Sequence, residues 1–172
     1  PDACQLLTFM AGRSLTALAP EIEKLAAYLG DRRQIERADV EAMVTPAPEY
    51  TAFQMIDAAL EKDVGRAQTL LKALLEAGET PVGVLALIER QMRMMTHIRR
   101  LRARGESVPA IAAALSLNGY AAQMAARHAA RFSEESLEQG YRASVDADYA
   151  IKSGRLRDEA ALGWVLMVLN GL

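Results

Sequence analysis

The chain has 172 residues, of which 51% are hydrophobic, so it can bury one medium-sized core or two small ones. Its 20 basic and 22 acidic residues leave a formal net charge of -2, which argues against nucleic-acid or membrane binding through whole-chain charge. The single cysteine, Cys4, excludes an internal disulfide and suits a reducing cytoplasm. The chain shows no secretory leader pattern and no apolar run long enough to span a bilayer, so we expect neither export nor membrane insertion.

The composition also predicts an all-α fold. Aromatic residues make up only 5% of the chain, whereas strong helix formers such as alanine and leucine are frequent. In the N-terminal part, apolar spacing predicts helices over residues 3–11, about 19–29 and 39–44. Pro20 sets the start of the second helix near Ala19, because proline fits best in a first turn. The stretch from Thr45 to Pro48 then interrupts any helix and marks a domain boundary.

The rest of the chain predicts a helical bundle. Asp63, Thr80 and Ser107 stand where helix N-caps are expected. Apolar residues recur at helical spacing in two helices within 53–77 and in the ranges 81–104, 107–115, 120–131, 134–152 and 158–169. We therefore expect a small helical domain in residues 1–46 and a helical bundle in residues 47–172.

Three ordered stretches resemble the delta subunit of the bacterial DNA polymerase III clamp loader, and the resemblance covers nearly the whole chain. They are Gly12-Arg-Ser-Leu15 leading to Glu21-Ile-Glu-Lys24-Leu25, then Glu49-Tyr50 with Phe53, Ile56 and Asp57, and finally Asp148-Tyr-Ala-Ile-Lys152-Ser-Gly154. Arg13-Ser14 departs from the Asn-Asp usual in the family, and Glu36 stands where a threonine commonly caps the third lid helix.

The resemblance implies that residues 1–46 form the lid of an AAA+ module and residues 47–172 the collar. Through its collar the chain would assemble with the loader ATPase subunits (gamma/tau) and delta prime to load the sliding clamp on primed DNA during replication. The family's N-terminal nucleotide-fold domain, which binds the clamp, is expected to be absent from this chain. DNA would then be reached through the assembled complex, and the chain would be a non-catalytic subunit of a DNA-directed DNA polymerase, a nucleotidyltransferase.

The sequence offers no catalytic, cofactor or metal site. Neither a phosphate-binding Gly-x-x-x-x-Gly-Lys loop nor a Gly-x-Gly-x-x-Gly fingerprint occurs. His97 and His128 lack the spacing of metal ligands and read as two exposed helix residues. Cys4 has no activating neighbour in sequence and is expected to be a core thiol.

Two sets of residues are candidates for a partner interface. Along the predicted helix 81–104, basic residues at spacings of three and four form one stripe, namely Arg90, Arg93, His97, Arg100 and Arg104. Such a stripe suits an acidic partner or phosphates, although a solvated face opposite the apolar stripe is the more ordinary interpretation. Trp164 and Val168 are candidates on the last helix. If that helix joins a ring of subunits, some of its apolar residues should stay exposed.

Two other classes of function remain open from the sequence. Residues 107–131 have the form of a helix-turn-helix DNA-binding motif around Asn118-Gly119, but the second helix starts Tyr-Ala-Ala-Gln-Met-Ala-Ala and carries few groups that could read bases. A generic helical scaffold unrelated to replication is the third interpretation.

Overall fold

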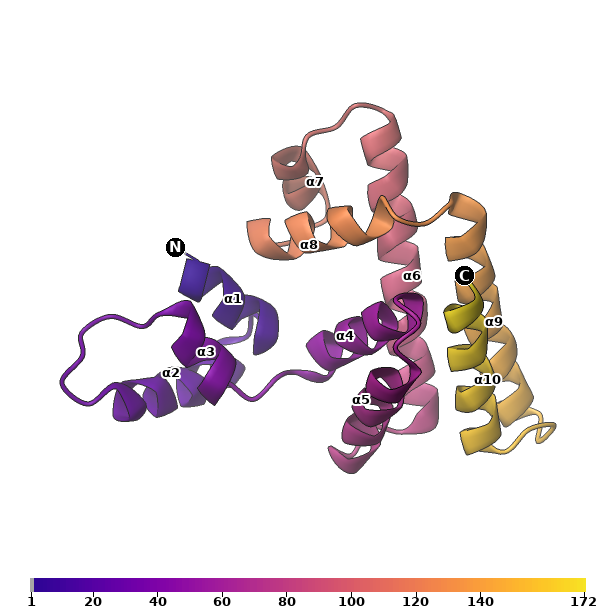
Figure 1. Ribbon diagram of the computed structural model, residues 1–172, viewed down its shortest axis with the longest axis horizontal. Helices are drawn as coiled ribbons and strands as arrows, with labels where there is room; N and C mark the ends of the chain where they lie inside the picture. The colour runs from indigo at the N-terminus through magenta and orange to yellow at the C-terminus, as the bar shows by residue number, and fades with distance from the viewer. Residues whose placement is uncertain (1) are drawn as a thin grey trace. The chain divides into compact units, whose positions relative to one another are not determined.

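The computed structural model describes residues 2–172, and over that range it contains ten α-helices and no strand. In chain order they are α1 (Asp2–Met10), α2 (Leu15–Leu29), α3 (Arg37–Met43), α4 (Pro48–Leu60), α5 (Val64–Glu76), α6 (Pro81–Ala103), α7 (Val108–Ala114), α8 (Gly119–Ala129), α9 (Glu134–Lys152) and α10 (Asp158–Gly171) (Figure 1). The predicted all-α fold is confirmed. Within the described range, no helix is both long and apolar enough to cross a membrane.

Short polar side chains start several helices where the sequence predicts them. Asp63, Thr80 and Ser107 each accept a hydrogen bond from the backbone N–H three residues further on, at the starts of α5, α6 and α7. Ser133 does the same for α9. Each bond satisfies a donor that the helix itself leaves without a partner, and a cap of this kind contributes about 1 kcal/mol.

The prediction that the second helix starts near Ala19 is wrong. Helix α2 begins at Leu15, because Ser14 accepts a hydrogen bond from the Ala17 N–H, and Pro20 lies inside the helix. Proline lacks the N–H that would bond to the carbonyl group four residues earlier, so one helical hydrogen bond is lost there. The cap and the buried side chain of Leu25 outweigh that loss.

Helix α3 also starts earlier than predicted, at Arg37 rather than Asp39. The side chain of Asp39 accepts a hydrogen bond from the Glu36 N–H at 2.9 Å and fixes the first turn. Arg32 donates two further hydrogen bonds to the same carboxylate, the shorter at 2.8 Å. The Asp39 side chain is only 7% exposed whereas that of Arg32 is 52% exposed, so the loop before α3 is anchored by an ion pair at the edge of the fold.

One compact unit contains the chain up to Tyr50 together with Glu106–Met124. Its apolar core is formed by Leu6, Leu7, Met10, Ala11, Leu25, Val40 and Val44. The later segment joins this core through the Asn118 side chain, which donates a hydrogen bond to Thr8, and through the Tyr120 ring, which meets Phe9 edge to face at 5.5 Å. The unit is therefore discontinuous in sequence, and the domain division at residues 46 and 47 stays a prediction.

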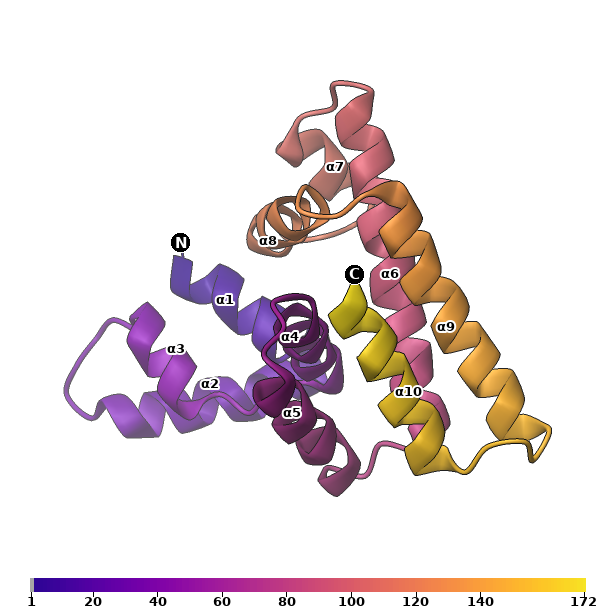
Figure 2. The same cartoon turned by 45° about the vertical axis from the view of Figure 1, so that its right-hand side comes forward.

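The second compact unit contains Thr51–Gly105 and Ala125–Leu172. Within it, α9 runs along α6, and α10 packs against both (Figures 1 and 2). The predicted apolar stripe of the long helix α6 is confirmed as core, since Leu85, Ile88, Met92, Met95 and Ile98 are all buried. Burying each of these side chains contributes about 1.5 to 3 kcal/mol.

Small residues on α9 permit this packing. Gly140, Ala143, Ser144 and Ala147 are all buried and lie three or four residues apart on one face. A Cβ atom at Gly140 would lie 3.0 Å from Met92 Sδ on α6 and 3.0 Å from Leu169 Cδ2 on α10. The buried Ser144 hydroxyl donates a hydrogen bond to the Gly140 carbonyl oxygen at 3.0 Å and so needs no partner from another helix.

Two side chains lie differently from the sequence prediction. Cys4 is exposed, not a core thiol, because the buried face of α1 is formed by Leu6, Leu7 and Met10 and Cys4 falls outside it. His128 is only 6% exposed, so it is not a surface residue. Its Nδ1 lies 2.7 Å from Asp57 Oδ1, and its ring lies 5.0 Å from that of Phe53.

Substitutions at Gly140 test the three-helix contact. We expect Gly140→Ala to change the free energy of unfolding by less than about 1 kcal/mol, because improved helix propensity offsets tight contacts with two flexible side-chain ends. Gly140→Leu should lower it by about 3 kcal/mol. Urea unfolding followed by circular dichroism measures both, with Gly163→Leu as control, since nothing lies within 4 Å of a Cβ at Gly163. Equal losses at both glycines would contradict the packing.

The buried carboxylate of Asp39 predicts a pH dependence. Hydrogen bonds from Arg32, then from the Glu36 N–H, lower the pKa of Asp39 below its usual value of 3.8. A lowered folded-state pKa stabilises the fold above the unfolded-state pKa, and this stabilisation is lost as the pH falls through the folded-state value. Asp39→Asn should therefore lower the thermal midpoint at pH 7 but have little effect near pH 2. A midpoint difference of the same size at both pH values would contradict this assignment.

Candidate functional site

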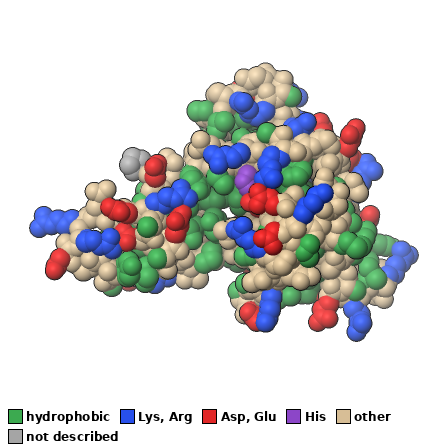
Figure 3. Space-filling view, in the orientation of Figure 1, with side chains coloured by type: hydrophobic (Ala, Val, Ile, Leu, Met, Phe, Trp, Pro, Cys, Tyr) green, Lys and Arg blue, Asp and Glu red, His purple; other side chains and the backbone are tan. Residues whose placement is uncertain are grey.

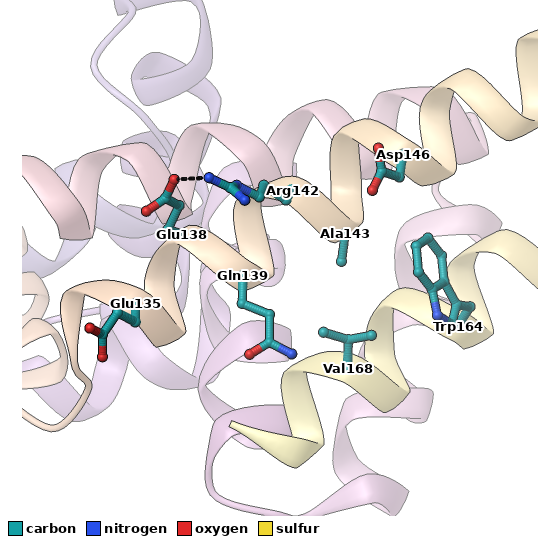
Figure 4. A pocket seen from close by; sticks show the side chains of 8 residues that line it. All are labelled: Glu135, Glu138, Gln139, Arg142, Ala143, Asp146, Trp164 and Val168. Carbon is teal, nitrogen blue, oxygen red and sulfur yellow. Dashed lines mark hydrogen bonds and ion pairs between the residues drawn. The ribbon is translucent and has the colours of Figure 1, made fainter.

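A groove lies between α9 and α10 and has a volume of about 390 Å³. It is lined by Glu135, Glu138, Gln139, Arg142, Ala143, Asp146, Trp164 and Val168. Figure 4 shows Trp164 and Val168 on α10 directed toward α9, with Ala143 opposite them. The small side chain of Ala143 leaves room for an apolar group between the two helices.

The position of Trp164 and Val168 follows from the sequence of α10. Its buried face is formed by Ala161, Leu162, Val165, Leu166 and Leu169. Trp164 and Val168 are one turn apart at the edge of that face and are half-buried, while Met167 is 66% exposed. The expectation that apolar residues of the last helix stay exposed is therefore confirmed.

The apolar surface extends beyond the groove. Trp164 also lines a second depression, of about 500 Å³, whose other apolar residues are Ala150, Leu156 and Ala160. Leu156 is 40% exposed. We call the continuous strip of Leu156, Trp164 and Val168 the α10 strip. We treat it as a candidate binding region.

Acidic side chains border the α10 strip. Glu135, Glu138 and Asp146 line the groove with one basic residue, Arg142, whose guanidinium lies 2.5 Å from Glu138 Oε1. An apolar centre with a polar border is the usual composition of a protein–protein interface. The border here favours a partner that carries basic residues around an apolar patch.

The arginine stripe on α6 lies on a different surface. Arg90, Arg93, His97, Arg100 and Arg104 are all exposed, as the predicted stripe requires. Arg100 forms an ion pair with Glu134 at 2.5 Å, and the Arg93 guanidinium lies 6.0 Å from the centre of the Tyr141 ring. Arg100 and Arg104 line a pocket that does not contain Trp164 or Val168. The structure thus gives two candidate surfaces, and their roles as partner interfaces stay predictions.

Glu89 precedes the stripe on α6 and has a perturbed pKa. Burial raises the pKa of its carboxyl group, and the nearby charge of Asp148 raises it further, while Arg93 and Lys152 act in the opposite direction. Elsewhere charges of both signs are interspersed, as the face in Figure 3 shows, which fits the small net charge. Among the described residues, no group of three or more His, Cys, Asp or Glu side chains could hold a metal ion.

The helix-turn-helix interpretation finds no support in the geometry. The first turn of α8, which would have to contact DNA bases, packs into its own compact unit. Ala121 and Ala122 are buried, and the Tyr120 hydroxyl accepts a hydrogen bond from Arg37 at 3.0 Å. A recognition helix needs side chains free to reach the major groove at that position.

Sequence reasoning missed the acidic side of the groove and the basic pocket. Glu135, Glu138 and Asp146 are ordinary exposed residues of an amphipathic helix, and only the position of α10 beside α9 makes them line one groove. Arg102 lines the basic pocket with Arg99 but lies outside the predicted stripe. The high density of arginines in residues 99–104 is a sequence signal that could have indicated the basic pocket.

Comparison with known proteins identifies relatives of this chain. Residues 49–169 match the family model for the DNA polymerase III delta subunit, C-terminal domain. The chain is 26% identical over 168 residues to DNA polymerase III subunit delta of Bacillus subtilis (strain 168), covering 98% of this chain and 48% of the relative. It is 25% identical over 108 residues to a probable DNA polymerase III subunit delta of Aquifex aeolicus (strain VF5), covering 62% and 31%.

A solved structure of a delta protein has a similar fold. The Bacillus subtilis DNA clamp loader delta protein superposes with a TM-score of 0.81 at 26% identity, over 99% of this chain and 50% of that one. The chain thus spans about half the length or less of the relatives it matches.

Fluorescence of Trp164, the only tryptophan, tests the groove directly. We expect acrylamide to quench its emission, because the indole is partly exposed. Caesium ions should quench more effectively than iodide relative to a free tryptophan derivative, because Glu135, Glu138 and Asp146 attract cations. Asp146→Asn should reduce the difference between quenching by caesium and quenching by iodide, because it removes one of these negative charges. Emission that resists acrylamide would show that the groove is closed.

Proposed function

The chain belongs to the DNA polymerase III delta subunit family, and from this premise we propose that it is the assembly region of a bacterial clamp-loader subunit. It joins the loader ATPase subunits (gamma/tau) and delta prime through residues 47–172, which serve as its collar. The assembled complex loads the sliding clamp on primed DNA during replication in the cytoplasm. The chain contributes no catalytic residue to that complex.

The exposed α10 strip is the observation that carries this proposal. Leu156, just before α10, and Trp164 and Val168 on α10 leave apolar area in contact with water, next to the buried face of that helix. Covering that area with a partner contributes roughly 25 cal/mol for each Å² removed from water. Aromatic side chains such as Trp164 are the residues most often found to dominate binding energy at interfaces.

The two candidate surfaces differ in charge, which suits a ring of subunits. A ring needs two different surfaces on each subunit, because each subunit meets its neighbours head to tail. The groove between α9 and α10 is bordered mainly by acids, whereas the exposed stripe on α6 is basic. Complementary charges of this kind orient partners and speed their association.

Residues 1–46 have a different role in the proposal. Residues 1–46 correspond to the lid of an AAA+ module, and the sliding clamp is contacted by a part of the protein outside this chain. The ion pair between Arg32 and Asp39 and the core around Leu25 make the lid a folded element. It would transmit movements of the ATPase ring to the collar.

Light scattering after mixing the chain with purified loader ATPase and delta-prime subunits tests the proposal. We expect a stable complex that contains one copy of this chain. Trp164→Ala with Val168→Ala should weaken it by about 2 kcal/mol or more, because apolar anchors are removed from the centre of the interface. Arg93→Gln should have a smaller effect that diminishes as salt is raised.

The matched control is Leu15→Ala, which removes an apolar side chain that is 84% exposed on α2, outside the proposed collar. It should leave the affinity unchanged. Separate species in every mixture would contradict assembly through this chain. A complex that forms equally well with the double variant would show that the α10 strip is not the interface.

A further inference from the structure

A further groove of the second compact unit lies between α5 and α10 and has a volume of about 290 Å³. Val64, Leu71 and Leu75 on α5 form one wall, and Leu166 and Met167 on α10 contribute to the other. It shares no lining residue with the groove between α9 and α10 or with the depression beside Trp164. We call it the α5–α10 groove.

Apolar side chains of the α5–α10 groove remain in contact with water. Met167 is 66% exposed and Val64 is 45% exposed, while Leu71 and Leu75 are half-buried. The methionine side chain is flexible and can adapt to the shape of a ligand. Removing this apolar surface from water would favour the binding of an apolar ligand.

Gly163 lines the α5–α10 groove from within α10, where the chain's own packing does not require a glycine. Glycine inside a helix is destabilising relative to alanine, because it has more backbone freedom to lose on folding. At Gly140, two side-chain atoms lie 3.0 Å from the position of a Cβ, whereas nothing lies within 4 Å of that position at Gly163. An open glycine lets a second backbone approach the helix closely. The position of Gly163 therefore points to a ligand from outside the chain.

The shape of the α5–α10 groove suits a short helix. Its lining extends along α10 from Glu159 to Asn170, which is about 16 Å at a rise of 1.5 Å per residue. Both walls are helices, whose backbone groups are already hydrogen-bonded within each helix, so an extended peptide would find no backbone partners there. A helix satisfies its own backbone groups and needs only apolar side chains on one face to fit such a groove.

The two ends of the α5–α10 groove are polar. Glu159, near the start of α10, is the only charged residue among the described residues that line the groove, and its carboxylate forms no ion pair within residues 2–172. Asn170 lines the other end, and its Oδ1 is buried without a hydrogen-bond partner. An unsatisfied buried acceptor costs free energy, which a donor on the ligand can offset once the Asn170 side chain turns. The lone carboxylate favours a ligand with a cationic side chain at the Glu159 end.

We propose that the α5–α10 groove binds a short amphipathic helix of a protein partner. A small residue of that helix lies against Gly163, its apolar side chains contact Leu71 and Met167, and a lysine or arginine lies near Glu159. The groove is a different surface from the α10 strip, so this contact does not depend on the proposed assembly.

Selection from a displayed library of helical peptides of about 14 residues, long enough for three turns, tests this proposal. The enriched peptides are labelled and titrated with the full chain by fluorescence anisotropy. We expect them to share a glycine, alanine or serine at one position and a lysine or arginine one or two turns away. Gly163→Leu should weaken their binding by about tenfold or more, because the leucine occupies the space of the bound helix. No enrichment, or enriched peptides without the small residue, would overturn the proposal.

Gly163→Ala separates binding from stability. It should raise the thermal midpoint, because alanine favours the helix, and yet weaken peptide binding, because its Cβ keeps the second backbone further away. Glu159→Gln should weaken binding by about fivefold at most, and this loss should diminish as salt is raised. Unchanged binding by Gly163→Ala and Glu159→Gln together would overturn the proposed arrangement of the bound helix.

The matched control is Gly65→Leu, which adds the same side chain at an exposed glycine of α5 outside the lining of the groove. A Cβ at Gly65 would meet only Asp63 Oδ1, at 3.9 Å, so the fold should tolerate it. The control should leave peptide binding unchanged. Equal losses in Gly65→Leu and Gly163→Leu would show that the peptides bind elsewhere and would overturn the proposal.

Light scattering of the chain alone distinguishes a partner helix from a second copy of this chain. We expect the mass of a monomer at the concentrations used for the titrations. A dimer that Gly163→Leu converts to monomer would show that a second copy fills the α5–α10 groove, and it would overturn the proposal.

Discussion

The close contact of α9 with α6 and α10 is the constraint on which the second compact unit depends. Helices pack closely only where the facing side chains of one helix are small. On α9, Gly140, Ala143, Ser144 and Ala147 form such a surface. At Gly140, atoms of Met92 and Leu169 occupy the space that any Cβ would need to share. Close packing of this kind limits how far a core can adjust, so the register of the three helices is fixed together.

The register of the three helices also determines which of their residues face solvent. Because Leu162, Val165 and Leu169 are buried, Trp164 and Val168 must lie at the border between α10 and α9. Because Ile88, Met92 and Met95 are buried on α6, the arginines between them must face solvent. The candidate assembly surface and the basic pocket are thus both consequences of one packing arrangement.

Local sequence signals were enough to predict the helices but not their neighbours. Caps at Asp63, Thr80 and Ser107 act over three residues, so they can be read directly, and the periodic apolar stripe of α6 is equally local. The start of α2 was predicted wrongly from Pro20, because the cap at Ser14 outweighs the one hydrogen bond that the proline loses. The burial of His128 depends on Asp57 and Phe53, about 70 residues earlier, and the inclusion of α7 in the first unit depends on contacts such as Asn118 with Thr8. Contacts at such separations leave no periodic trace in the sequence.

Hydrogen exchange of the chain, alone and mixed with purified loader ATPase and delta-prime subunits, tests the central claim most directly. If the α10 strip and the adjacent groove are covered on assembly, amides in residues 134–146 and 158–170 will exchange more slowly in the mixture, because opening of these helices is suppressed by the partner. Protection confined to residues 2–43, or none in any segment, would contradict assembly through this surface.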